Sequence, residues 1–154
     1  MRTMGNLFIF FVLVLFLSIG TAIADTGMVS VKSAHSVTDT LDRLEALLKE
    51  KGMTVFARIN HTAGAEKVGL ALRPTEQVIF GNPKIGTPFM QCKQTVAIDL
   101  PQKALAWEDE NAQVWLSYND PQYIAERHEV EGCGEVIDKL SKALGNFATA
   151  ATAP

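Results

Sequence analysis

Residues 36–60, SVTDTLDRLEALLKEKGMTVFARIN, contain the change of hydrophobic period that decides the fold. Over residues 37–48 the apolar side chains recur every three or four positions, which is typical of one buried stripe along an α-helix. Ser36, with an acid three residues later, predicts the helix N-cap, and Gly52 after a charged run predicts the helix end. Residues 54–60 then alternate as a β-strand does. The sequence therefore predicts a long helix followed closely by a strand.

The rest of the chain carries further strand and helix signals. We expect a strand over 28–33, a short helix over 66–72 that Pro74 ends, a strand over 77–80, a helix over 87–94 with Pro88 in its first position, a hairpin over 103–119, a short helix from Asp120-Pro121 to His128, and a long helix from Gly134. Two long helices with four or so strands predict an α+β domain, in which the helices pack on one face of a mainly antiparallel sheet.

The register of the expected hairpin stays open. If Trp107 faces Trp115 directly, the two form a cross-strand aromatic pair on one face of the sheet. A slip of one residue places them on opposite faces.

Residues 1–24 have the pattern of a secretory signal peptide. Arg2 precedes an apolar run over 7–20, and Ala22-Ile23-Ala24 supplies the small residues that a signal peptidase accepts. The alternative is a retained membrane anchor, but the run is shorter than the roughly 20 residues that a spanning helix needs. We expect cleavage before Asp25 and a periplasmic or secreted protein.

Composition narrows the classes of partner. The chain has 154 residues, 47% of them hydrophobic and 20% charged, which excludes a collagen and a wholly disordered chain. Cleavage moves the formal net charge from −3 to −4, because Arg2 is lost while all seventeen acids stay. An acidic protein without a run of Lys or Arg would repel a phosphate backbone, so no nucleic acid is expected as a partner. No second apolar run reaches spanning length, so we expect no membrane partner after cleavage.

A chain of this size has surface enough for one core, so residues 25–147 are expected to form a single domain. Residues 148–154, ATAATAP, contain nothing large to bury, and we expect them to be a disordered tail.

Cys92 and Cys133 are the only two cysteines of the chain. An oxidising compartment allows them to form a disulfide, and two buried free thiols are the alternative. Sequence does not decide between these, because it does not show whether the two Cα atoms come within roughly 7 Å of each other.

The sequence contains few of the motifs that are typical of catalytic or metal sites. The sequence has no G-x-S-x-G, H-E-x-x-H or C-x-x-C motif, and its three histidines lie in separate segments, so no metal site is expected. His61, which ends a strand beside a loop of small residues, is either a cleft residue or a structural histidine. Asp99 is either a second cleft residue or a side chain that closes a turn.

Four runs of sequence resemble the family known as the domain of unknown function 302, over roughly residues 28–147. They are GMTVFARINHTAGA (52–65), FGNPKIGTPFMQ (80–91), AIDLPQKALAWED (97–109) and VWLSYNDPQYIAERH (114–128). The resemblance implies a β-α-β4-α fold, similar to a single copy of the TATA-binding-protein arrangement with additional short helices, and members that tend to form dimers. It implies no established reaction. The positions that match the family's recurrent residues are Asn60, His61, Gly81, Asn82, Pro83, Pro88, Asp99, Leu100, Pro101, Trp107 and Tyr118.

These observations favour a non-catalytic binding or interaction module, with no cofactor. The apolar segment Phe80 to Met90 suits either a pocket for a small apolar ligand or a surface for self-association as a homodimer. The candidate binding residues are His61, Asn82, Asp99 and Trp107. The alternative is an enzyme or redox protein that gathers His61, Asp99 or Cys92 in a cleft, and a metal or haem carrier is a weaker third hypothesis.

Overall fold

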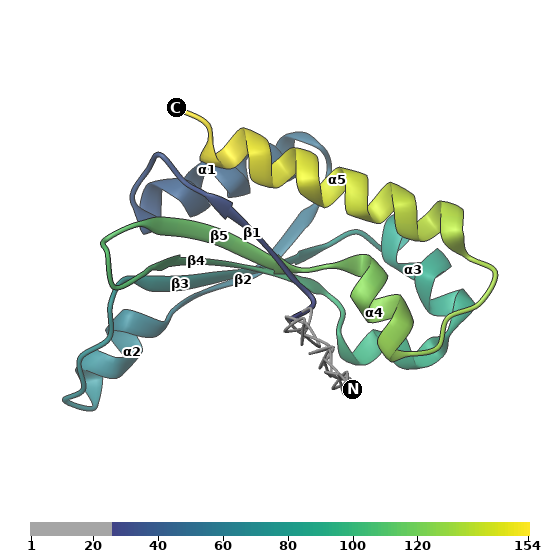
Figure 1. The fold of residues 1–154 in the computed structure, drawn as a ribbon, viewed down its shortest axis with the longest axis horizontal. Coiled ribbons are helices and arrows are strands. Elements are labelled where there is room, and N and C mark those ends of the chain that lie inside the picture. Colours follow the sequence, from purple (N-terminus) through teal and green to yellow (C-terminus); the bar gives the residue numbers. More distant parts are fainter. Residues whose placement is uncertain (1–25) are drawn as a thin grey trace, which may run out of the picture.

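A five-stranded antiparallel sheet with two long helices on one face forms the body of the protein (Figure 1). The structure is a computed structural model that describes residues 26–154, so the expected signal peptide at 1–24 lies outside the described residues. The elements in chain order are β1 (Met28–Lys32), α1 (Val37–Glu50), β2 (Thr54–Asn60), α2 (His61–Lys67), β3 (Thr75–Gly81), α3 (Pro83–Cys92), the 3-10 helix η1 (Gln94–Ile98), β4 (Gln102–Glu108), β5 (Val114–Asn119), α4 (Pro121–Arg127) and α5 (Gly134–Thr152).

The strands lie in the order β1-β5-β4-β3-β2, and every neighbouring pair is antiparallel. The expected α+β class and the β-α-β4-α order with additional short helices are therefore confirmed. Trp107 lies directly opposite Trp115, which settles the register of the hairpin in favour of one shared face. The β2–β3 register shifts between Val55 and Ala57, so Phe56 lies at a β-bulge on an edge strand.

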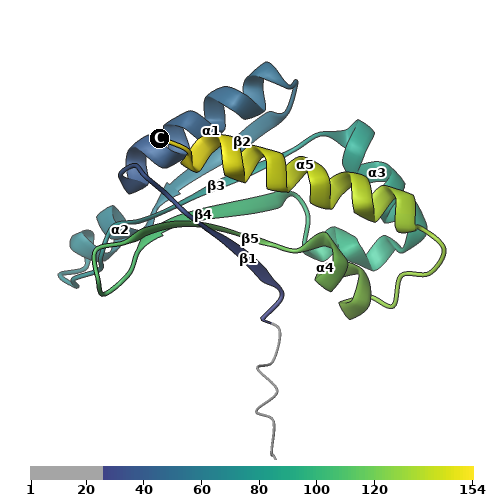
Figure 2. The same cartoon turned by 45° about the horizontal axis from the view of Figure 1, so that its top comes forward.

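The main core lies between the sheet and the two long helices, α1 and α5. Both helices lie on the same side of the sheet in both views (Figures 1 and 2). The helix α1 buries the stripe expected from its spacing, and β3, β4 and β5 supply the facing side chains. The largest fully buried members are Leu41, Leu44, Leu48, Val78, Phe80 and Leu116. This stripe holds α1 against the sheet, as its sequence predicts.

A second apolar cluster lies at one end of the sheet, beneath the first half of α5. It joins α3, η1, α4 and α5, and its buried members are Phe89, Val96, Ile124, Ala125, Ile137 and Leu140. Figure 2 shows α3 and α4 together at this end, with α2 at the opposite end of the sheet. The helix α5 is therefore shared: its first half covers the second cluster and its last half covers the sheet.

Two short helices do not lie where their sequence predicts them. We expected residues 66–72 to be helical, but α2 occupies 61–67, because the Asn60 side chain accepts a hydrogen bond from Ala63 N at 2.7 Å and starts the helix there. We expected a second short helix over residues 87–94, but α3 occupies residues 83–92. It starts earlier because Asn82 is its N-cap and Pro83 takes its first position. Pro88 lies inside α3 instead of opening it. Asparagine caps outweigh the apolar spacing in both cases.

The expectation of a disordered tail at 148–154 is wrong. The helix α5 continues to Thr152, Ala148 and Ala151 are buried against α1 and the sheet, and Arg43 Nε of α1 donates to Ala151 O at 3.1 Å. Alanine is the strongest helix former, and its small side chain lets two helices approach closely. The small side chains that suggested disorder are therefore the ones that allow α5 to pack against α1.

Candidate functional site

An apolar cavity of about 250 Å³ lies between the main core and the second cluster, where β3 ends and β4 begins. Its walls come from β2, the β3–α3 corner, α3, the segment before β4, and α5. The large apolar side chains around it include Met53, Phe56, Ile85, Met90, Leu100 and Leu140. Small-molecule sites have this character, being concave and mostly apolar with few polar groups. We call this site the apolar cavity.

The corner between β3 and α3 shapes one wall of the apolar cavity. A Cβ on Gly81 would lie 3.4 Å from Phe56 Cε2 and 3.5 Å from Pro101 Cβ, so glycine leaves room between these two rings. The Asn82 side chain accepts from Lys84 N at 2.9 Å and donates to Gly52 O at 2.9 Å. Asn82 thus ties this wall to the α1–β2 turn, and both ends of its amide are occupied by backbone groups.

The apolar cavity contains one buried polar side chain whose hydrogen bonding is not met. Gln102, the first residue of β4, is 6% exposed, and its Nε2 is buried with no hydrogen-bond partner among residues 26–154. Thr87 also borders the cavity, but it is exposed and can be solvated. No charged side chain of the described part lines the cavity. The site offers an apolar surface, with one unpartnered amide nitrogen buried in its wall.

Asp99 lies directly before Leu100 and Pro101 of the cavity wall, and its carboxylate points to a neighbouring polar cluster. Asp99 Oδ2 lies 2.7 Å from His128 Nε2, and Oδ1 accepts from Arg127 Nη1 at 3.1 Å. His128 Nδ1 in turn lies 3.1 Å from Thr95 Oγ1. These bonds join η1 to the end of α4, so Asp99 serves the packing behind the wall and does not line the cavity.

His61 and Trp107, the other two predicted binding residues, lie away from the apolar cavity. His61 is the exposed first residue of α2, which follows the end of β2. The residue of β2 that lines the cavity is Phe56, five positions before His61, which corresponds to about 16 Å at about 3.3 Å a residue. Trp107 alternates with the buried Ala104 and Ala106, so it lies on the opposite face of the sheet, which no helix of residues 26–154 covers and which we call the sheet face without helices. There its Nε1 donates to Ser117 Oγ at 2.9 Å. Of the four predicted binding residues, only Asn82 borders the cavity.

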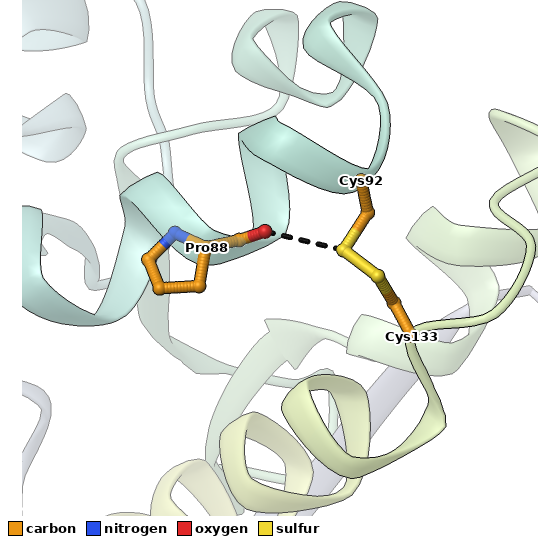
Figure 3. Close-up of a disulfide and its surroundings, with 3 residues drawn as sticks. All are labelled: Pro88, Cys92 and Cys133. Atoms are coloured by element: carbon orange, nitrogen blue, oxygen red, sulfur yellow. Dashed lines mark hydrogen bonds between the residues drawn. A yellow bond between two sulfur atoms is a disulfide. The ribbon is translucent and has the colours of Figure 1, made fainter.

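Cys92 and Cys133 form a disulfide, with their Cα atoms 6.3 Å apart. Figure 3 shows Cys92 at the end of α3 joined to Cys133, which precedes the first turn of α5. Cys92 Sγ also lies 3.1 Å from Pro88 O, a sulfur–oxygen contact because a disulfide sulfur has no hydrogen to donate. The disulfide holds together the two helices that supply Met90 and Leu140 to the cavity.

His61, Asp99 and Cys92, the residues of the enzyme hypothesis, do not come together. No hydrogen bond in the described part joins any two of them, and the sulfur of Cys92 is held in the disulfide. Residues 26–154 also contain no group of three His, Cys, Asp or Glu side chains placed to hold a metal ion. No helix in the same range is long and apolar enough to cross a membrane.

The groups with a displaced pKa lie outside the apolar cavity within the described range. Hydrogen bonds from the Trp115 indole and then from backbone N–H of Gln113 hold the pKa of Asp109 below its usual value. Burial, and then the charge of Asp120, raises the pKa of Tyr118. Burial opposes the charge of Arg58, but hydrogen bonds to carboxylates of α1 and β3 raise its pKa overall. These shifts mark structural contacts of the hairpin and the core.

Sequence reasoning missed Gln102, although a signal for it was present. Gln102 shares the inward parity of Ala104 and Ala106 in β4, so strand alternation places its polar side chain on the buried face. A polar residue at an inward position of a strand is a stronger indication of a site than a polar residue in a loop, because a buried polar group requires a hydrogen-bond partner.

The comparisons with known proteins place the fold and leave the activity open. The model of the family described as "Domain of unknown function DUF302" matches residues 29–147. A "Fluoride-specific ion channel FluC 1" of Brucella suis biovar 1 (strain 1330) is 52% identical over 118 residues, which cover 77% of this chain and 46% of that protein. A "Fluoride-specific ion channel FluC 2" of Brucella melitensis biotype 1 is also 52% identical over 118 residues, covering 77% of this chain and 44% of the relative. The chain spans less than half the length of these curated relatives.

A solved structure supports the architecture. The crystal structure of an uncharacterized conserved protein DUF302 from Bacillus stearothermophilus superimposes with a TM-score of 0.75 at 19% identity, and the match covers 82% of this chain and 99% of that one. At this identity the likeness concerns the fold.

Proposed function

Because the chain belongs to the DUF302 family, whose description assigns no activity, we propose from the site itself that the protein binds a small, largely apolar molecule in the apolar cavity. The names of the curated relatives describe ion channels, and the shared part is less than half of each, so we draw the function of this chain from its cavity. The observation that carries the proposal is a concave apolar site of about 250 Å³ with the buried amide of Gln102 in its wall.

Binding is favoured over catalysis by the chemistry of the lining. Within the described residues, no titratable side chain borders the apolar cavity, so no general acid, base or nucleophile faces a molecule there. Apolar side chains from β2, α3 and α5 instead offer dispersion contacts and removal of apolar surface from water.

A variant that fills the apolar cavity tests the proposal directly. Gly86 of α3 borders the cavity, and a Cβ there would lie 3.8 Å from Leu100 Cδ1, at ordinary contact distance. The Cβ of Gly86→Leu therefore fits without a shift, and the rest of the leucine should fill the cavity, while a helix-favouring residue replaces a glycine. Gly64→Leu is the matched control, because Gly64 lies in α2 with open space around it and outside the cavity.

The readout is titration with the neutral fluorescent dye N-phenyl-1-naphthylamine. We expect one saturable site in the natural protein and in Gly64→Leu, and binding at least about tenfold weaker in Gly86→Leu with no fall in its melting temperature. Dye binding that does not saturate, or that Gly86→Leu leaves unchanged, would overturn the proposal.

Self-association is the second candidate function, and the sheet face without helices favours it. Trp107 and Trp115 lie side by side there, and Ile59 of the edge strand β2 is 38% exposed. An apolar sheet face is the kind of surface that a second copy of the chain can cover. Sedimentation of the natural protein and of Leu105→Lys, a variant on the same face, tests this: a dimer that the variant dissociates supports it, and a monomer at all concentrations contradicts it.

We also propose a periplasmic or secreted location, which the sequence of residues 1–24 supports. The disulfide suits this location, because disulfides persist in oxidising compartments. Mass spectrometry of the protein recovered from cells should show Asp25 as its first residue, and a protein that retains Met1 would contradict the proposal.

A further inference from the structure

We infer that Gln102 selects the ligand of the apolar cavity, and that the ligand is a neutral molecule with an apolar body and one carbonyl-type oxygen. This inference rests on the proposed function, because it names the class of molecule that the same cavity takes. It is carried by the side-chain Nε2 of Gln102, which is buried in the cavity wall and has no hydrogen-bond partner within residues 26–154.

A buried amide without a hydrogen bond is unfavourable, and most buried polar side chains have a partner. The neighbours do not supply one. Both ends of the Asn82 amide are bound to backbone groups, and the only other polar side chain at the cavity, Thr87, is exposed. The structure therefore retains an unfavourable group within the wall of the apolar cavity, one side-chain rotation away from a bound molecule.

The unmet group is an N–H donor, so its complement is an acceptor. The terminal torsion of a glutamine side chain is soft, so the amide can turn its N–H toward a molecule in the cavity. A ketone, ester or amide oxygen would accept this hydrogen bond while the rest of the molecule packs against Phe56, Met90 and Leu140.

Charged ligands fit the site poorly. No cationic side chain of the described part lines the apolar cavity, and the nearby Lys103 Nζ is bound to the carbonyls of Asp99 and Pro101, at 3.1 Å each. A carboxylate would lose its hydration without gaining an opposite charge. A neutral acceptor avoids that loss, which favours a carbonyl compound over an acid.

A pair of probes of nearly equal shape separates recognition of the oxygen from general apolar binding. Acetophenone and α-methylstyrene differ by C=O against C=CH2, and each is used to displace N-phenyl-1-naphthylamine. The ratio of their inhibition constants is measured in the natural protein, in Gln102→Leu, and in Gln77→Leu. Gln77 is the matched control, because it lies on β3 with its side chain on the face away from the helices. Comparison of ratios removes the difference in hydration of the two probes.

We expect Gln102→Leu to shift the ratio about tenfold against acetophenone, the size of one buried hydrogen bond, and Gln77→Leu to leave it unchanged. The variant should fold, because leucine has no buried donor left without a partner. An unchanged ratio in Gln102→Leu, with the dye still bound at one saturable site, would overturn this inference and leave the proposed function intact. Failure of the dye to bind the natural protein at a saturable site would overturn both.

Discussion

Removal of the Cys92–Cys133 disulfide is expected to lower the free energy of unfolding by about 4 kcal/mol. The two residues are 41 positions apart, and closing a loop of that length in the unfolded chain removes about 13 cal/mol/K of entropy in the chain-entropy relation. At room temperature this entropy corresponds to about 4 kcal/mol. The perturbation is the double variant Cys92→Ala with Cys133→Ala, which avoids leaving a single free thiol.

Urea denaturation followed by far-UV circular dichroism measures the effect. With a denaturant slope of about 2 kcal/mol/M, the double variant should unfold at a urea concentration lower by about 2 M. The natural protein treated with a reductant is the internal control, because its midpoint should fall close to that of the double variant. A midpoint that shifts by less than about 0.5 M at equal slope would refute the reasoning, because it would mean that the bridge does not restrict the unfolded chain.

Three further predictions concern the helix pair, the buried ion pair and a buried phenol. Truncation after Phe147 removes the buried end of α5 and its hydrogen bonds to α1. The free energy of unfolding, measured by thermal denaturation, should fall by about 2 to 4 kcal/mol. An unchanged melting temperature would contradict the packing of residues 148–154. Glu76→Gln leaves Arg58 without its most buried partner and should lower the free energy of unfolding by about 1 to 3 kcal/mol. Glu50→Gln, at an exposed pair, should leave the urea midpoint nearly unchanged, and equal effects of the two variants in urea denaturation would argue against the buried pair. Because the pKa of Tyr118 is raised in the folded protein, the unfolded chain loses the phenol proton at lower pH than the folded one. The free energy of unfolding should therefore decline as pH rises above the ordinary value of 10.0. Between about pH 8 and about pH 11, the free energy of unfolding of Tyr118→Phe should decline less than that of the natural protein. Parallel declines would show that this phenol is not the cause.

Much of the fold was predictable because its signals are local. The apolar stripe of α1, the capping Ser36, the hairpin around Asp109 and the Asp120-Pro121 start of α4 each depend on residues that are close in the chain. The order of these elements was enough to predict the α+β class and the β-α-β4-α arrangement.

The errors arose where local signals compete. At α2 and α3 the apolar pattern suggested helices that start several residues later, but asparagine caps at Asn60 and Asn82 decide the first turn. In the last residues of α5 the small side chains suggested disorder, but contact with α1 makes small side chains favourable. A propensity gives the preference of a segment in isolation, and a packed neighbour can reverse it.

The candidate site was less predictable than the fold, because it is assembled from distant segments. The segment Phe80 to Met90 was singled out from its composition, and it does form part of the cavity wall. However, His61, Asp99 and Trp107 point elsewhere, and Gln102 was not singled out. The pairing of Asp99 with His128 spans 29 positions and has no local signature.

By itself the sequence determined the two long helices, the strands and the hairpin, the family, and the export pattern of residues 1–24, because each depends on neighbouring residues or on a run of letters. Only the tertiary structure decided that Cys92 meets Cys133, that Trp107 faces Trp115, and that Gln102 Nε2 is buried without a partner in the wall of an apolar cavity. The physical reason is that these features depend on distances between segments, which folding sets by the burial of apolar surface from the whole chain at once.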